Sequence, residues 1–290
     1  MTSSSRFIDF CMRKERAAAA ARLEPFQCVL DHSARFHLEV VSTPFSDALL
    51  DGPFFQSDDE REYPSINLVF VQSRNGNTEA RDPSTLGGGE TDKHVIYEGL
   101  SRLGADAVMS GARTIGRGNL IFSVWHPALV SLRQARRKPR HPIQIVATTS
   151  GAIPIETGLL FNVPDIRVVI MTGPRGAEAL RDRLRSRPWI SVLNTGTGSD
   201  LRAGVRRLHD EFGISRVSAV GGRTLATALI DQSLVKDLYL TTGAIDGGTR
   251  DTPFYEGSDF PERDLVVRKR SREGILFEHF ILHDRGSSSA

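Results

Sequence analysis

Four short stretches rich in glycine and hydroxyl side chains follow apolar runs, and their residue types suit the binding of phosphate groups. Glycine lets backbone N–H groups approach an anion closely, and a helix N-terminus adds a favourable dipole. Any one such turn is weak support, because strand-to-helix turns also use Gly, Ser and Thr for positive φ and for capping. The four stretches are VMSGARTIG (108–116), VATTSG (146–151), IMTGP (170–174) and AVGGRT (219–224).

The recurrence of these turns carries more weight than any one of them. In a parallel sheet, ligands bind beyond the carboxyl ends of the strands, where such turns meet. Together they predict one extended polyanionic ligand, such as a dinucleotide, lying along the sheet edge. No G-x-G-x-x-G sequence follows the first strand of the predicted alternation, and residues 195–201 (TGTGSDL) hold only its G-x-G part. A Rossmann fingerprint is therefore absent.

The elements that must position these turns alternate between strands and helices from Pro64 onward. The near-continuous apolar run SINLVFVQS (65–73) predicts a strand buried on both faces. Apolar spacing predicts helices over 90–104, 176–186 and 200–213, and another after the glycine pair. This pattern implies an α/β fold with a mainly parallel sheet, closed by an antiparallel hairpin. The other predicted strands lie within 106–111, 143–151, 166–174, 189–196, 214–220, 235–245, 264–272 and 274–282.

The first 62 residues differ from the rest and are predicted to form an N-terminal extension. Residues 6–24 favour a helix, and FQCVL (26–30) and FHLEVV (36–41) favour short strands. The acidic, turn-rich residues 45–64 are interpreted as a linker or wrapping arm rather than a lid. We expect residues 63–285 to form the main domain and residues 286–290 a disordered tail. The basic cluster RQARRKPRHP (133–142) is interpreted as a solvated loop rather than a phosphate-contacting one.

Composition sets the broad class of protein. The chain has 290 residues, 39% of them hydrophobic and 25% charged, as in soluble globular proteins. A net charge of +2 gives no case for nucleic acid, and no apolar run approaches the roughly 20 residues of a membrane span. Two cysteines and scattered histidines support neither a disulfide framework nor a metal site. With no signal peptide expected, a cytoplasmic location is predicted.

Three segments carry a resemblance to a known family. They are YPSINLVFVQSRNGNT (63–78), ADAVMSGARTI (105–115) and VGGRTLATALIDQSLVKDLYLTTGAIDGG (220–248). They resemble, in order, the reductase domain of bacterial bifunctional riboflavin-biosynthesis proteins, a relative of dihydrofolate reductase. The zinc-binding residues of the deaminase domain of those proteins have no counterpart here. The resemblance spans residues 63–282 and implies a dihydrofolate reductase-like three-layer α/β/α sandwich that forms a homodimer.

The resemblance also implies NADPH as cofactor and a place for each turn along it. The turn of Gly111 and Thr114 would lie near the nicotinamide and the pyrophosphate. The turn after residue 147 would meet the adenosine half with its 2′-phosphate, and the glycine pair, joined by a cis peptide bond, would cradle the pyrophosphate. The implied cofactor-binding residues are Gly111, Thr114, Thr148, Thr149, Ser150, Gly221, Gly222, Arg223 and Thr224.

The substrate side departs from the family pattern. The family's Ser-x-Asp-Gly is here Ser73-Arg74-Asn75-Gly76, and an asparagine amide can orient a substrate but cannot titrate near neutral pH. Trp125 stands in the place of an arginine that reads the ribose phosphate, and Val220 replaces a glutamate. The remaining candidates for orienting the substrate are Asn75, Asn119 and Ser123.

These features predict an NADPH-dependent reductase that resembles 5-amino-6-(5-phosphoribosylamino)uracil reductase and transfers a hydride to a C=N or C=O carbon. A diverged dihydrofolate or pterin reductase and a non-catalytic NADPH-binding relative are the alternatives. No residue is assigned as proton donor. Glu90, Asp92 and His94 open a predicted helix, where charges on a solvated face near the N-terminus are the simpler interpretation. An ordered water near Asn75 would serve equally well.

Overall fold

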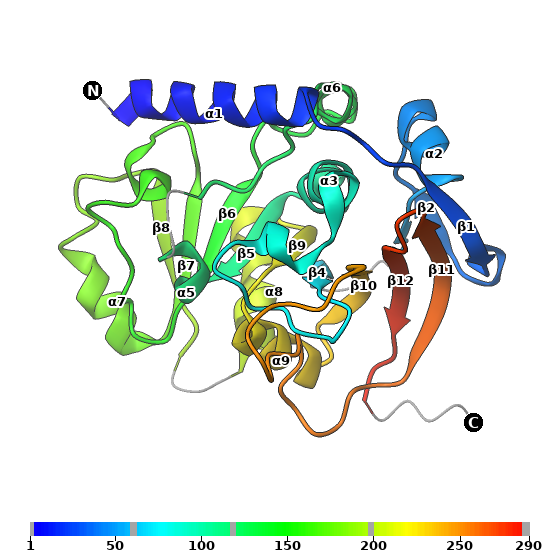
Figure 1. Cartoon of the computed structure of the whole chain (residues 1–290). Helices are drawn as coiled ribbons and strands as arrows, with labels where there is room; N and C mark the ends of the chain where they lie inside the picture. Colours follow the sequence, from blue (N-terminus) through cyan, green and yellow to red (C-terminus); the bar gives the residue numbers. More distant parts are fainter. Residues whose placement is uncertain (1–2, 59–62, 117–119, 197–199, 286–290) are drawn as a thin grey trace.

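A ten-stranded sheet forms the centre of the computed structural model, which describes residues 3–58, 63–116, 120–196 and 200–285 (Figure 1). The strand order is β1-β11-β12-β10-β4-β9-β5-β6-β7-β8. Neighbouring strands from β10 to β8 are parallel, whereas β12, β11 and β1 continue the sheet antiparallel. The strands are β1 (Phe26–Asp31), β4 (Ser65–Gln72), β5 (Ala107–Gly111), β6 (Ile143–Ala147), β7 (Val168–Thr172), β8 (Ile190–Asn194), β9 (Arg216–Val220), β10 (Val235–Thr242), β11 (Arg263–Ser271) and β12 (Leu276–Leu282).

Helices cover both faces of the sheet. On one face, Leu208 and Leu229 from two helices pack against Leu68 of β4. On the other face, Phe10 of the N-terminal helix joins the same cluster as Val146 of β6. The predicted α/β/α sandwich with a mainly parallel sheet and a C-terminal antiparallel hairpin is therefore confirmed. The helices are α1 (Ser3–Ala19), α2 (Pro44–Leu50), α5 (Ala112–Ile115), α6 (Pro127–Ala135), α7 (Pro174–Arg181), α8 (Leu201–Phe212) and α9 (Arg223–Asp231).

One further helix follows the long loop after β4. It runs without a break through α3 (Gly89–Thr91), η3 (Asp92–Leu100) and α4 (Ser101–Leu103), and its middle segment η3 is wound as a π-helix. A helix over 90–104 was predicted, but nothing in the apolar spacing indicated the wider winding, which often occurs at functional sites. Shorter 3₁₀ turns are η1 (Ser33–Arg35), η2 (Pro83–Leu86) and η4 (Leu159–Asn162).

The N-terminal extension adds to the main sheet and builds a second one. Its strand β1 pairs with β11, while β2 (Leu38–Val40) pairs with β3 (Phe55–Ser57). The linker interpretation of residues 45–64 is wrong for α2 and β3. Helix α2 begins at a capping box in which Thr43 and Ser46 satisfy each other's backbone N–H groups. The Thr-Pro pair at 43–44 is the sequence signal that predicts such a start.

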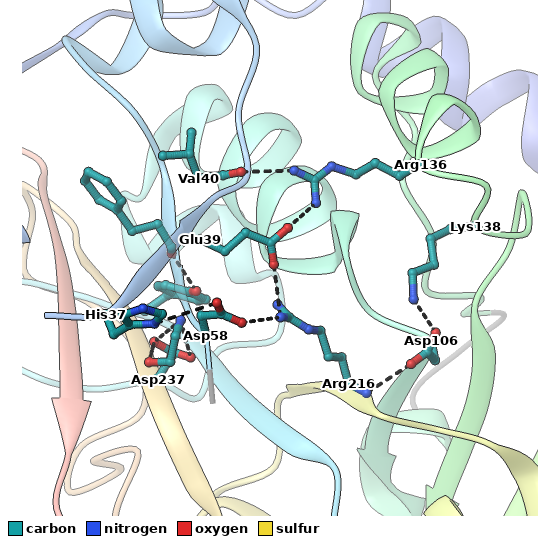
Figure 2. A network of polar contacts seen from close by, with 12 residues as sticks. His37, Glu39, Val40, Asp58, Asp106, Arg136, Lys138, Arg216 and Asp237 are labelled. Carbon is teal, nitrogen blue, oxygen red and sulfur yellow. Dashed lines mark hydrogen bonds and ion pairs between the residues drawn. The ribbon is translucent and has the colours of Figure 1, made fainter. Parts of the chain in front are cut away.

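The basic cluster at 133–142 is partly buried rather than a solvated loop. Arg133 is 1% exposed, and its guanidinium donates to the carbonyls of Arg102, Leu103 and Ala105 at 2.8, 3.0 and 2.9 Å. Buried carbonyls at a helix C-terminus need donors, and a buried arginine fork supplies several at once. Nearby, Arg136 and Lys138 join the polar network shown in Figure 2, which lies at the amino ends of the parallel strands.

Candidate functional site

The glycine pair and the Gly111–Thr114 turn lie side by side at the carboxyl edge of the sheet. Strands β5 and β9 are parallel neighbours, so the turns that follow them emerge at the same edge. A Cβ added to Gly222 would lie 3.3 Å from Thr114 Oγ1, and one added to Gly221 would lie 3.6 Å from Thr114 Cγ2. Thr114 therefore sits directly against the glycine pair. The structure brings together the two turns that were predicted to meet the same part of a cofactor.

Both glycines also need their backbone freedom. Gly221 has φ +66° and Gly222 has φ +86°, values that L side chains rarely adopt. The expected cis peptide between them is wrong, because every peptide bond in the described ranges is trans. The two successive positive φ angles reverse the chain between β9 and α9, and this accounts for the missing side chains without a cis bond.

The third predicted turn follows β6, the neighbour of β5 on its other side. Thr148 Oγ1 accepts a hydrogen bond from the backbone N–H of Gly151 at 3.2 Å, and Ser150 Oγ accepts one from Ala152 at 3.3 Å. Thr149 and Ser150 are exposed. A Cβ on Gly151 would come within 2.9 Å of the Gly176 carbonyl oxygen, so this turn packs closely against α7. The three turns thus follow one another along the edge in the order β9, β5, β6.

Arg223 and Thr224 are the first two residues of α9, directly after the glycine pair. Thr224 is exposed. The Arg223 guanidinium is engaged by two carboxylates: its Nη1 lies 3.0 Å from Glu256 Oε1 and its Nη2 lies 3.5 Å from Glu79 Oε2. The sequence did not indicate these partners, because both come from loops far away in the chain.

Those two loops, residues 73–79 after β4 and residues 246–256 after β10, form one hydrogen-bonded unit that we call the loop pair. Ser73 Oγ donates to the Gly247 carbonyl at 3.0 Å, and the Thr78 backbone N–H donates to the Thr252 carbonyl at 2.8 Å. Because β4 and β10 are parallel neighbours, the loop pair stands at the same edge as the glycine turns. It is joined to the start of α9 by the two ion pairs of Arg223.

The three substrate-orienting candidates are not brought together. Asn75 lies in the loop pair, where its Oδ1 accepts from Ser73 Oγ at 2.6 Å and from Asn77 Nδ2 at 3.2 Å. Ser123 is 0% exposed, and its Oγ is 2.9 Å from His141 Nδ1. Asn119 lies outside the described residues. The side-chain oxygen of Asn75 is thus occupied by hydrogen bonds within its own loop, and Ser123 lies in the protein interior.

The two substituted family positions are also internal. Trp125 is 1% exposed; its ring lies 5.6 Å from that of Phe10 in α1, and the Arg140 guanidinium lies 5.3 Å from it. Val220 is 0% exposed in the same apolar cluster. Helix α1 of the extension therefore covers the place where the family pattern has a phosphate-reading arginine.

Asp92 is buried, contrary to the expectation from the sequence. The solvated-face interpretation is wrong for it and for His94, which are 4% and 1% exposed. Thr241 Oγ1 donates to Asp92 Oδ1 at 2.5 Å, and Thr241 is next to the last residue of β10, opposite Val71 of β4. Burial raises the pKa of the Asp92 carboxyl to about 7, although the Thr241 hydrogen bond acts in the opposite direction. A buried carboxyl with a pKa near neutrality is a candidate for acid–base chemistry.

Asp92 and the glycine turns lie on neighbouring parts of one edge. Strand β4 separates β10 from β9, and strands are about 4.8 Å apart. The ends of β10 and β9 are thus separated by about 10 Å. Val71, whose strand position faces Thr241, lies between the two.

Two comparisons of the sequence with known proteins found matches. The sequence profile described as the RibD C-terminal domain matches residues 64–274. A 2,5-diamino-6-ribosylamino-4(3H)-pyrimidinone 5′-phosphate reductase of Archaeoglobus fulgidus is 26% identical over 176 residues, which cover 60% of this chain and 78% of that protein.

Solved structures share the fold. A pyrimidine reductase-like protein of Corynebacterium diphtheriae superposes with a TM-score of 0.62 at 18% identity, covering 76% of this chain and 93% of that one. RibD of Acinetobacter baumannii gives 0.59 at 16%, covering 77% and 58%. The riboflavin biosynthesis reductase Rib7 of Saccharomyces cerevisiae gives 0.54 at 15%, covering 78% and 93%. These matches confirm the resemblance stated from the sequence: the chain belongs to the RibD C-terminal domain family.

Proposed function

We propose that this protein is an NADPH-dependent reductase of the riboflavin-biosynthesis type, with residues 63–285 as the reductase domain. The observation that carries the proposal is the contact between Thr114 and the Gly221–Gly222 pair on neighbouring strands. Both glycines have a positive φ that side chains rarely adopt, and the backbone N–H groups at the start of a helix suit a pyrophosphate. Membership of the RibD C-terminal domain family supports the same assignment.

The residues present fit such a cofactor. The glycine pair, Thr114 and Thr224 would hold the pyrophosphate, and the exposed hydroxyls of Thr149 and Ser150 would meet the adenosine half. When bound, the nicotinamide would supply a hydride to a C=N or C=O carbon of the substrate. The role of the protein is to place the two reactants against each other and to exclude water.

We assign Asp92 as the group that holds a proton on the substrate side. With a pKa raised to about 7, its carboxyl carries the proton in a large share of molecules at neutral pH. Thr241 donates to Oδ1, and the other oxygen, Oδ2, lies against Gly88 and would carry the proton. Asn75 cannot take this role, because an amide does not titrate near neutrality.

The substrate we propose is a pyrimidine that carries a ribosylamino group, as named for the Archaeoglobus relative. Two tests are decisive. The purified protein should bind NADPH saturably, followed by nicotinamide fluorescence, and should oxidise it with 2,5-diamino-6-ribosylamino-4(3H)-pyrimidinone 5′-phosphate or 5-amino-6-(5-phosphoribosylamino)uracil. Oxidation with dihydrofolate alone would favour a pterin reductase, since buried Trp125 removes one phosphate contact. Binding without turnover would favour a non-catalytic relative, and absence of binding would contradict the whole proposal.

We further propose a cytoplasmic homodimer. No helix in the described ranges combines the length and apolar character of a membrane span. A groove of about 540 Å³ lies over the antiparallel half of the sheet, and we propose that a second copy covers it. Light scattering at increasing protein concentration should give twice the mass of one chain, and a monomer at all concentrations would contradict the dimer. The groove is lined by the apolar residues Leu238, Leu240, Phe254, Phe260 and Phe280 and by the charged residues Arg263, Arg268 and Glu278.

A further inference from the structure

Arg223 is the point at which the cofactor cradle and the loop pair meet. It follows Gly222 directly, and its guanidinium reaches one carboxylate from each half of the loop pair, Glu79 and Glu256. The two halves hold each other through backbone bonds, such as Thr249 N–H to the Glu79 carbonyl at 2.7 Å. A single side chain at the start of α9 therefore contacts both loops.

The Arg223 guanidinium is shared between two carboxylates. Both of its terminal nitrogens are engaged by them, and these are the nitrogens with which an arginine binds a phosphate. A dianionic pyrophosphate beside the glycine pair would meet an arginine that is already occupied and a carboxylate that repels it.

We propose that Glu256 and Glu79 compete with the cofactor's phosphate groups for Arg223, so that cofactor binding loosens the loop pair on α9. This proposal rests on the proposed function, because it takes a phosphate-bearing cofactor as the ligand. Arg223 is then a positioning residue: without ligand it holds the loop pair down, and with ligand it turns to the phosphate. The remaining anchors of residues 246–256 on α9 are the Glu256 backbone N–H to Thr227 Oγ1 at 2.9 Å and Tyr255 OH to Asp231 at 2.7 Å.

The functional consequence is an order of events. A loop pair fastened by Arg223 stays against the start of α9 until the cofactor is in place. When the guanidinium exchanges partners, the loop pair keeps its internal hydrogen bonds and moves as one piece, because the bonds between residues 73–79 and 246–256 do not involve Arg223. Cofactor binding thereby precedes substrate binding.

The competition for Arg223 is tested by whether NADPH affinity rises or falls when one of the carboxylates is removed. Glu256→Gln removes a competing charge and should tighten NADPH binding by about 3- to 10-fold, measured by nicotinamide fluorescence. Glu79→Gln should act in the same direction but less, because its contact is longer. Glu262→Gln, an exposed charge removed from the neighbouring segment, is the control and should leave Kd unchanged. Weaker or unchanged binding in Glu256→Gln would overturn the proposal.

A second measurement separates this proposal from the proposed function. Hydrogen exchange of residues 246–256 should be faster in Arg223→Gln than in the wild-type protein with no ligand present. Inorganic pyrophosphate should speed it in the wild-type protein and leave Arg223→Gln unchanged. If NADPH fails to bind while these exchange differences appear, the proposed function fails and the Arg223 restraint stands. Exchange unaffected by Arg223→Gln would overturn the restraint itself.

Discussion

The two edges of the parallel sheet are built in opposite ways. At the amino ends, charged side chains meet in the network of Figure 2, where Asp106 accepts the backbone N–H groups of Ser215 and Arg216 at 3.0 Å each and lies 2.5 Å from Lys138. Arg216 in turn lies 3.0 Å from Glu39 of the N-terminal extension. At the carboxyl ends, glycine turns leave backbone groups and exposed hydroxyls beside a buried carboxyl.

Within a single strand, the residues that stabilise the fold and the residues available to a ligand therefore lie at opposite ends. Strands β5 and β9 contribute to both edges. The amino end of each is held by paired charges, while the carboxyl end is available to a ligand. In open α/β sheets ligands bind beyond the carboxyl ends, and polar groups kept free for a ligand do not stabilise the empty fold. Substitutions at the amino edge should therefore change unfolding, and those at the carboxyl edge should change binding.

The largest expected effect is at the amino edge. Arg133→Met leaves the carbonyls of Arg102, Leu103 and Ala105 without their buried donor. We expect a loss of about 3 kcal/mol in the free energy of unfolding by urea, with NADPH affinity unchanged. Arg136→Met at the end of the same helix breaks a half-exposed contact with Glu39 and should cost less than about 1 kcal/mol. If both variants lost the same free energy of unfolding, the burial of the arginine's partners would not determine its contribution to stability.

The next effect is at the carboxyl edge. Gly222→Ala places a Cβ 3.3 Å from Thr114 Oγ1 at a positive φ, which moves the cradle. NADPH binding should weaken by at least about 10-fold, while the free energy of unfolding falls by about 1–2 kcal/mol. Gly213→Ala is the control, because Gly213 also has positive φ but has open space around it. It should lose similar stability and keep its affinity, and unchanged affinity in Gly222→Ala would make the pair an ordinary turn.

The two edges also differ in how far the sequence predicts them. Apolar runs and terminal glycines predict the strands and the turns at Gly111, Thr148 and Gly221, because these features are local. The amino edge depends on pairs such as Glu39 with Arg216, which join distant parts of the chain, and no periodicity reveals them. Asp92 was missed for the same reason. Its burial involves Thr241 on β10, which is 149 positions away in the chain and is brought to it only by the fold.

Asp92 gives the carboxyl edge a pH dependence. Its pKa is raised to about 7, so between its unfolded value and that pH the folded state binds more protons, and stability falls as pH rises. The wild-type protein should lose about 1 kcal/mol relative to Asp92→Asn between pH 6 and pH 8, measured by urea unfolding. In parallel, kcat of the wild-type enzyme should fall as pH rises above about 7, since Asp92 must carry the proton. A difference that does not vary with pH would show that Asp92 does not titrate there.

The smallest expected effect concerns a single hydroxyl at the carboxyl edge. Thr224 is exposed at the start of α9, and one hydrogen bond from its hydroxyl to a phosphate is worth about 0.5–1 kcal/mol. Thr224→Val should therefore weaken NADPH binding by about 2- to 5-fold with no loss in the free energy of unfolding. Thr227→Val on the same helix removes the acceptor of the Glu256 N–H instead. This variant should be slightly less stable than the wild-type protein. Because it loosens the loop pair, its NADPH affinity should be unchanged or higher. The two variants thus distinguish a hydroxyl that binds the ligand from a hydroxyl that holds a loop.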